Sequence, residues 1–263
     1  MKNLLNIAVN AALEGGAEIL EVYNSDFAVE TKDDKSPLTL ADKRAHEKIC
    51  AHLEATEIPV LSEEGSAVPY EERSTWKRFW MVDPLDGTKE FVKRNGEFTV
   101  NIALIEDGHP VAGVIYVPVK KDLYAGIVGD GAFKATDVAP NAAADYEGLK
   151  RTAQAIPFPK NGKPFTAVGS RSHMSEETQA FFAELREKHG TVEVVSMGSS
   201  LKICLVAEGV ADIYPRFAPT MEWDTAAGHA IARAAGKEIT DRKTGKPMRY
   251  NKENLLNNWF VVQ

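Results

Sequence analysis

Cysteine is scarce in this chain, with only Cys50 and Cys204 among 263 residues. The chain therefore does not have the composition of a disulfide-stabilised secreted scaffold. Both thiols lie in apolar helical patterns far apart, so we expect them to be buried and reduced, as in a reducing cytoplasm. No Cys/His set has the spacing of a zinc site. The six histidines are separated by several residues, and His46 and His52 are most simply explained as residues on a solvated helix face.

Long apolar runs and a basic excess are also missing. The first six residues have no secretory h-region, and no segment approaches the ~20 apolar residues of a membrane span. We therefore expect a cytoplasmic protein without a transmembrane segment, and weak attachment to the inner face of the membrane stays open. The net charge of −7 argues against binding to a nucleic acid polymer, because no cationic excess is available to neutralise phosphates. An acidic protein that handles phosphate esters needs metal ions to reverse the local field.

The chain has enough apolar residues, 44% of the total, to bury a large core in one or two domains. Helical spacing of apolar residues predicts helices over 4–23 and 40–54, and short β-rich runs predict strands. The predicted strands of this half are 59–62, 80–82, 98–105, 111–117 and 123–128, the last three forming an antiparallel meander.

The second half has a different pattern, in which strands alternate with helices. The predicted strands are 165–169, 192–196 and 211–214, followed by helices over 175–189, 199–208 and 225–235 respectively, with two more short strands at 237–240 and 259–262. Periodicity is lost over 136–164. We therefore predict an α+β domain over 1–150 and an α/β domain over 151–263, so that the fold as a whole is of the α/β class.

The stretch 80–88 combines an apolar run with two carboxylates. Asp83 and Asp86 follow the run, and Pro84 and Gly87 are expected to force a rigid turn at the end of the strand. Both carboxylates can then point into one pocket, as the oxygen ligands of Mg²⁺ do. The alternative is an ordinary Asp-Gly hairpin turn, which is the usual explanation for an isolated Asp-Gly pair.

Other acidic residues that end apolar runs argue for the metal site. Glu63 follows a predicted strand, and Asp224 stands at the start of a predicted helix. If these two meet Asp83 and Asp86 in one pocket, four negative charges repel strongly and imply at least two bound Mg²⁺ ions. Asp42 falls in the first turn of the helix over 40–54, where a catalytic role and an interaction with the helix dipole are equally good explanations.

These motifs together resemble a known family. DPLDGT at 83–88, preceded by LSEE at 61–64 and followed by WDTAAG at 223–228, is similar to the signature set of the Mg²⁺-dependent, lithium-sensitive inositol monophosphatase superfamily. The resemblance implies a layered αβαβα sandwich. Four further segments resemble the 3'(2'),5'-bisphosphate nucleotidase branch: KEF at 89–91, SRSH at 170–173, GSSLK at 198–202 and YPRF at 214–217. Enzymes of that branch remove the 3'-phosphate from adenosine 3',5'-bisphosphate.

The resemblance also implies a ligand set. One Mg²⁺ is expected on Glu63, Asp83 and the backbone carbonyl of Leu85. A second is expected on Asp83, Asp86 and Asp224, and a weaker third ion beside Glu63 stays open. The sequence does not exclude an exchange of Glu63 with its neighbour Glu64.

Catalytic and loop residues follow from the same resemblance. Asp42 and Thr88 resemble the pair that positions and deprotonates the attacking water, since a hydroxyl bonded to a carboxylate can take a proton from acidified water. The backbone N–H groups of Gly87 and Thr88 would hold phosphate oxygens. Lys35 matches a position in the loop that closes over the metals.

Four residues resemble nucleotide contacts: His173, Ser199, Lys202 and Arg216. A second phosphate needs a cationic partner, which Lys202 and Arg216 supply. The alternatives are a solvated helix residue for Lys202 and a surface ion pair for Arg216. Glu222 matches a position that serves the inositol ring in inositol-specific relatives.

Three functions are therefore compared. The leading hypothesis is a phosphatase acting on adenosine 3',5'-bisphosphate or its sulfated form, a small-molecule nucleotide. The second is an inositol monophosphatase or a broad phosphatase for sugar phosphates or NADP, and the third is a noncatalytic nucleotide sensor. A monomer and a homodimer both remain open.

Overall fold

The computed structural model describes residues 1–25, 29–31, 37–65, 67–160, 162–169 and 175–263. Two of the sequence-predicted site residues, Lys35 and His173, lie outside these ranges. Within them, no helix has the length and apolarity needed to cross a bilayer.

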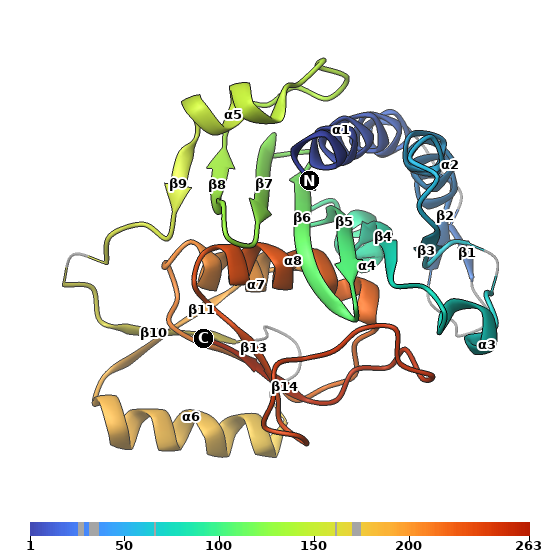
Figure 1. Cartoon of the computed structure of the whole chain (residues 1–263). Coiled ribbons are helices and arrows are strands. Elements are labelled where there is room, and N and C mark those ends of the chain that lie inside the picture. The colour runs from blue at the N-terminus through green and yellow to red at the C-terminus, as the bar shows by residue number, and fades with distance from the viewer. Residues whose placement is uncertain (26–28, 32–36, 66, 161, 170–174) are drawn as a thin grey trace.

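The elements stack in five layers, which can be followed from top to bottom in Figure 1. Helices α1 (Lys2–Tyr23) and α2 (Leu40–Glu54) cover one face of a seven-stranded sheet, and α7 (Leu201–Ala207) and α8 (Glu222–Ala234) cover the other. A second, smaller sheet follows, and α6 (Glu176–His189) closes the stack. The αβαβα order that the resemblance implies is confirmed.

The larger sheet has the strand order β3-β4-β5-β6-β7-β8-β9. Its strands are β3 (Val60–Ser62), β4 (Arg78–Asp86), β5 (Thr99–Glu106), β6 (His109–Val117), β7 (Asp122–Ile127), β8 (Gly131–Ala135) and β9 (Gln154–Ile156). The β3-β4 pair is parallel and every other pair is antiparallel, so the predicted meander is confirmed. The sequence patterns did not indicate β8 and β9, which extend the meander by two strands.

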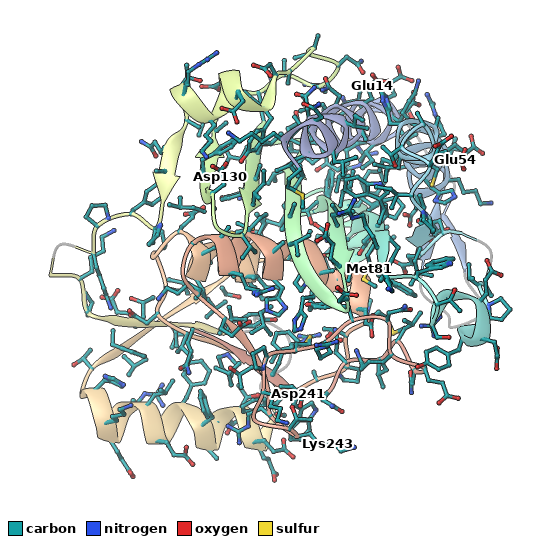
Figure 2. All side chains as sticks on the ribbon, in the orientation of Figure 1. Glu14, Glu54, Met81, Asp130, Asp241 and Lys243 are labelled. Atoms are coloured by element: carbon teal, nitrogen blue, oxygen red, sulfur yellow. The ribbon has the colours of Figure 1, made fainter. Side chains whose placement is uncertain are left out.

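Helices cover both faces of this sheet, and the central strands are therefore apolar on both sides. In β4, Trp80 and Val82 face the core beneath α1 and α2, whereas Met81 faces the core around α8. Figure 2 shows Met81 inside the molecule, and Glu14 and Glu54 on the outer side of the α1–α2 layer. The apolar run before Asp83 is thus a buried central strand, which fixes the carboxylate that follows it.

The smaller sheet joins two strand groups. Strands β10 (Phe165–Gly169) and β11 (Val192–Ser196) are parallel, and β12 (Tyr214–Arg216), β14 (Phe260–Val262) and β13 (Ile239–Asp241) are antiparallel in that order. A bridge between Ala167 and Ile213 connects the groups. Residues 211–214 were predicted as a strand, but β12 begins only at Tyr214. The division of the chain near residue 150 stays a prediction.

Five short elements complete the fold: β1 (Val29–Thr31), β2 (Pro37–Thr39), α3 (Tyr70–Arg73), α4 (Thr88–Val92) and α5 (Tyr146–Thr152).

Helix α8 lies unusually close to the sheet at Gly113 of β6. A Cβ added there would lie 2.6 Å from the Ala227 carbonyl oxygen and 2.9 Å from the Ala230 Cβ. Only glycine allows this approach, because even a methyl group would overlap the helix backbone. The approach fixes the height of α8 above the sheet, and with it the height of Asp224 at the start of the helix.

Replacing Gly113 with alanine should therefore destabilise the fold by roughly 1–3 kcal/mol, the usual cost of overpacking. Urea unfolding of Gly113→Ala measures the change. Gly148→Ala in α5 is a matched control, since its nearest neighbour is the tip of the Asp145 side chain; its stability should stay the same or rise slightly. Equal stability of Gly113→Ala and the native protein would contradict the packing argument.

Candidate active site

A β-bulge in β4 brings Asp83 and Asp86 to the same cavity. Residues three apart on a regular strand face opposite sides of the sheet. The ladder with β5 shifts register between Asp83 and Asp86, where Pro84 has no N–H to donate. Both carboxylates line one cavity of about 430 Å³. The sequence predicted a turn at Pro84; the strand instead continues through the bulge to Asp86.

The turn itself comes one residue later. Gly87 has φ 93°, in the left-handed region that favours glycine, and it starts the short helix α4 at Thr88. The bulge is fixed by the Leu85 N–H, which donates to Asp83 Oδ1 at 3.1 Å. The Thr88 hydroxyl lies 3.5 Å from the Leu85 carbonyl oxygen. Gly87, Thr88 and Leu85 all line the cavity.

Three carboxylates from distant parts of the chain form a cluster that could hold a metal ion. Glu63, Asp83 and Asp224 each offer an oxygen, and these atoms lie within 4.8 Å of one another. Glu63 follows β3 and donates its N–H to the Val82 carbonyl at 3.1 Å. Asp224 lies in the first turn of α8, where one of its oxygens accepts the Met221 N–H at 2.8 Å. An all-oxygen donor set of this kind suits a hard cation.

Crowding of these charges has a clear electrostatic effect. Burial, followed by the nearby Glu63 and Asp86 carboxylates, raises the pKa of Asp83 well above its ordinary value. Burial, followed by Asp86, raises the pKa of Asp224 to about 8. The cluster therefore favours protons at neutral pH unless a cation takes their place.

Asp86 lies on the cavity wall outside this three-residue cluster. One of its oxygens accepts the Ser200 N–H at 2.5 Å. Burial raises the pKa of Asp86, and the positive charge of Lys202 opposes that rise. Burial lowers the pKa of Lys202 to about 8, with Asp86 acting in the opposite direction. Asp86 thus connects the acidic side of the cavity to its basic side.

The basic side contains the predicted nucleotide residues that the structure describes. Ser199, Lys202 and Arg216 all line the cavity. The Lys202 ammonium donates to the Met197 carbonyl at 3.2 Å, so a fully solvated Lys202 is the wrong description. Arg216 donates to the Pro219 carbonyl at 3.1 Å, and its buried Nε has no hydrogen-bond partner in the described part of the chain.

Asp42 is placed differently from Thr88. It is buried, with 1% of its surface exposed, in the first turn of α2, and it is not among the residues that line the cavity. Its charge nevertheless contributes to the raised pKa of Asp83, so the two carboxylates lie within electrostatic reach.

Two glutamates that the sequence left open do not line the cavity in the described structure. Glu64 is one, so Glu63 is the member of the pair that faces the site. The other is Glu222, which is fully buried and accepts the N–H groups of Asn251 and Lys252 at 2.5 and 3.0 Å. Glu222 therefore has a structural role at the start of α8.

Sequence reasoning missed several polar residues of the site, among them Thr225, Ser200 and Asn101. Thr225 and Ser200 line the cavity, and Asn101 accepts the Ser200 hydroxyl at 2.9 Å from a fully buried position in β5. A signal for Asn101 was present, since it is an isolated amide in an otherwise apolar strand, and a buried amide requires partners.

Comparison with known proteins identifies the family. The model of the inositol monophosphatase family matches residues 1–260. The chain belongs to this family.

Curated relatives point to one branch of the family. The chain is 46% identical to the 3'(2'),5'-bisphosphate nucleotidase CysQ of Salmonella typhimurium and 44% identical to CysQ of Escherichia coli K12, each over 98% of this chain and 99% of the relative. Among solved structures, CysQ from Bacteroides thetaiotaomicron is 53% identical with a TM-score of 0.90, covering 99% of this chain and 96% of that one. An inositol monophosphatase from Thermotoga maritima, at 22% identity and a TM-score of 0.74 over 98% of this chain and 91% of that one, shares the fold.

The raised carboxyl pKa values predict how stability depends on pH. With a folded pKa of about 8 for Asp224 and an unfolded value near 3.9, the folded protein binds more protons between these values. Stability of the metal-free protein should therefore fall as pH rises from 6.5 to 8. Histidines with lowered pKa values act in the opposite direction near pH 6.5, and Lys202 does so near pH 8. The fall in stability should therefore be steepest between these two values.

Thermal unfolding in EDTA, followed at several pH values in this window, checks the prediction. Added Mg²⁺ should raise the melting temperature most at pH 8 and flatten the slope, because the cation replaces the protons. A melting temperature in EDTA that rises between pH 6.5 and 8 would contradict it.

Proposed function

We propose that the protein is a Mg²⁺-dependent 3'(2'),5'-bisphosphate nucleotidase, which hydrolyses the 3'-phosphate of adenosine 3',5'-bisphosphate to give AMP and phosphate. The observation that carries the proposal is the polarity of one cavity. Its lining contains the carboxylate cluster and also Lys202 and Arg216. A substrate with two phosphates can use both kinds of group at once. The names of the CysQ relatives support the same activity.

The metal assignments rest on the carboxylates and one carbonyl. We assign Glu63, Asp83 and the Leu85 carbonyl to one Mg²⁺, and Asp83, Asp86 and Asp224 to a second. When bound, the ions supply Lewis-acid activation of water and neutralise charge on the phosphoryl oxygens. In their absence Asp83 and Asp224 hold protons, which fits their raised pKa values.

Thr88 and Asp42 are assigned to proton handling. The Thr88 hydroxyl lies on the cavity wall beside the Leu85 carbonyl, where it can orient the attacking water and accept its proton. Asp42 is sheltered from solvent within electrostatic reach of Asp83, which suits a carboxylate that receives this proton in turn. The N–H groups of Gly87 and Thr88 begin a helix, where backbone donors lack intrahelical partners and can bind phosphate oxygens.

Lys202 and Arg216 are assigned to the 5'-phosphate. The buried Arg216 Nε has no partner among the described residues, and a phosphate oxygen would satisfy it. Lys202, whose pKa is lowered to about 8, would gain a further anionic neighbour and hold its proton more firmly. The Ser199 hydroxyl, on the same wall, can donate to the nucleotide.

Phosphate release from a panel of esters, with and without Mg²⁺, tests the proposal. The panel should contain adenosine 3',5'-bisphosphate, its sulfated form, inositol 1-phosphate, fructose 1,6-bisphosphate and NADP. We expect the highest kcat/KM for the adenosine bisphosphate and no turnover in EDTA. Asp83→Asn is the inactive control, because it removes a ligand shared by both ions. A large preference for inositol 1-phosphate would overturn the nucleotide assignment, and no release from any ester would favour a noncatalytic sensor.

Lys202→Ala should impair turnover of a substrate with two phosphates more than turnover of one with the 3'-phosphate alone. Loss of a charge-assisted contact lowers kcat/KM for adenosine 3',5'-bisphosphate by about 10- to 100-fold. Adenosine 3'-monophosphate, which lacks the second phosphate, should change by less than about threefold on the same reasoning. Lys188→Ala on exposed helix α6 is the control for loss of one positive charge. Equal losses on both nucleotides would show that Lys202 acts on the reaction itself.

A further inference from the structure

His46 is not on a solvated helix face, contrary to the expectation from sequence. It is half-buried on α2, and its Nδ1 lies 2.9 Å from the hydroxyl of Ser62. The Cys50 sulfur lies 3.6 Å from the same nitrogen and packs beside the ring. His52 is also half-buried, but its Nε2 pairs with Glu14 of α1 at 3.1 Å, on the outer side of the layer. The two histidines of α2 thus contact different parts of the fold.

Ser62 is the last residue of β3 and directly precedes Glu63. Strand β3 has only three residues and lies at the edge of the sheet, where β4 is its sole partner in the strand order. Besides this short ladder, the Ser62 carbonyl accepts the Gly65 N–H and the Glu63 N–H donates to the Val82 carbonyl, each at 3.1 Å. These bonds hold the backbone at the end of β3, and the side-chain bond from His46 adds a direct connection from α2 to the residue before Glu63.

His46 also stands one helical turn after Asp42. Residues four apart lie on the same helix face, so α2 presents a carboxylate and an imidazole toward the same side. The hydrogen bond to Ser62 consequently joins the helix that holds Asp42 to the strand that holds Glu63. These are two residues of the candidate active site that no common element connects.

We propose that His46 is a positioning residue of the metal site. Through its hydrogen bond with Ser62 it sets the place of the Glu63 carboxylate relative to Asp83 and to Asp42. The inference rests on the proposed function only in assigning Glu63 to a metal ion. It extends that proposal by naming a residue that contacts neither metal nor substrate and yet determines metal affinity.

Direct Mn²⁺ titration, followed by the EPR signal of the free ion, tests this without substrate turnover. His46→Ala and Ser62→Ala should each weaken binding by about three- to tenfold, the scale of a lost supporting hydrogen bond. The double variant should be no weaker than either single variant, because one bond is removed in all three. His46→Asn, whose amide can replace Nδ1 as a hydrogen-bonding group, should restore most of the affinity.

In kinetic assays, His46→Ala and Ser62→Ala should need a higher Mg²⁺ concentration for half-maximal rate. Their kcat at saturating Mg²⁺ should fall less than about twofold if Glu63 returns to its place on the ion. His52→Ala is the matched control and should keep native Mn²⁺ affinity. Thermal unfolding in EDTA identifies any variant that fails to fold, and Ser62→Ala and His46→Asn then carry the test.

Three results would overturn the inference: native Mn²⁺ affinity in folded His46→Ala or Ser62→Ala, additive losses in the double variant, or an equal loss in His52→Ala. Failure of the proposed function looks different. In that case the native protein itself would bind no Mn²⁺, or would bind it and hydrolyse none of the esters.

Discussion

Mutual repulsion between buried carboxylates is the constraint on which the site depends. Asp83 and Asp224 lie far apart in the chain, yet Asp224 is held close enough to contribute to the raised pKa of Asp83, and Asp86 and Glu63 contribute to the raised pKa of Asp224. Folding has to supply this arrangement from other sources of stability, because the acids themselves oppose it. The buried strand β4 and the close approach of α8 at Gly113 supply it through apolar packing on both sides of the sheet.

The lining of the cavity combines carboxylates with Lys202 and Arg216, and the substrate that we propose depends on this combination. An inositol monophosphate has one phosphate to place, so a carboxylate cluster with bound cations would be sufficient for it. An adenosine bisphosphate has a second phosphate, for which Lys202 and Arg216 are the partners that we propose. Glu222 is buried and pairs with Lys252. The negative charge of the cavity therefore comes from the carboxylates that line it.

Much of this arrangement could be predicted from the sequence. The meander and the helices α1, α2, α6 and α8 follow from apolar periodicity, because that periodicity records which faces are buried. The layer order followed from the resemblance to the family. The acidic residues could be named because each ends an apolar run at a strand or helix boundary. The bulge at Pro84 could not be predicted from the sequence, since Asp83 and Asp86 would face opposite sides of a regular strand. The register shift that reconciles them depends on pairing with β5, which is a tertiary contact.

Supporting residues were also beyond the reach of sequence patterns. Asn101, Ser200 and His46 act through partners that are 16 to 114 residues away, and such pairings appear only in three dimensions. The histidines show the difficulty well. His46 and His52 lie on one helix in similar sequence surroundings, but His46 contacts Ser62 of β3 and His52 contacts Glu14 of α1.

Asp86 interacts with both the acidic and the basic residues of the cavity. Its carboxylate accepts the Ser200 N–H at the start of the helix that also carries Lys202, and it belongs to the oxygen set assigned to a cation. A ligand that moves the Asp86 carboxylate toward the cation would therefore also change its hydrogen bond with Ser200, and the reverse holds. If nucleotide binding changes the affinity of the site for the ion by some factor, the ion must change the affinity for the nucleotide by the same factor. The binding of the cation and the binding of the nucleotide would then be coupled through the Asp86 side chain.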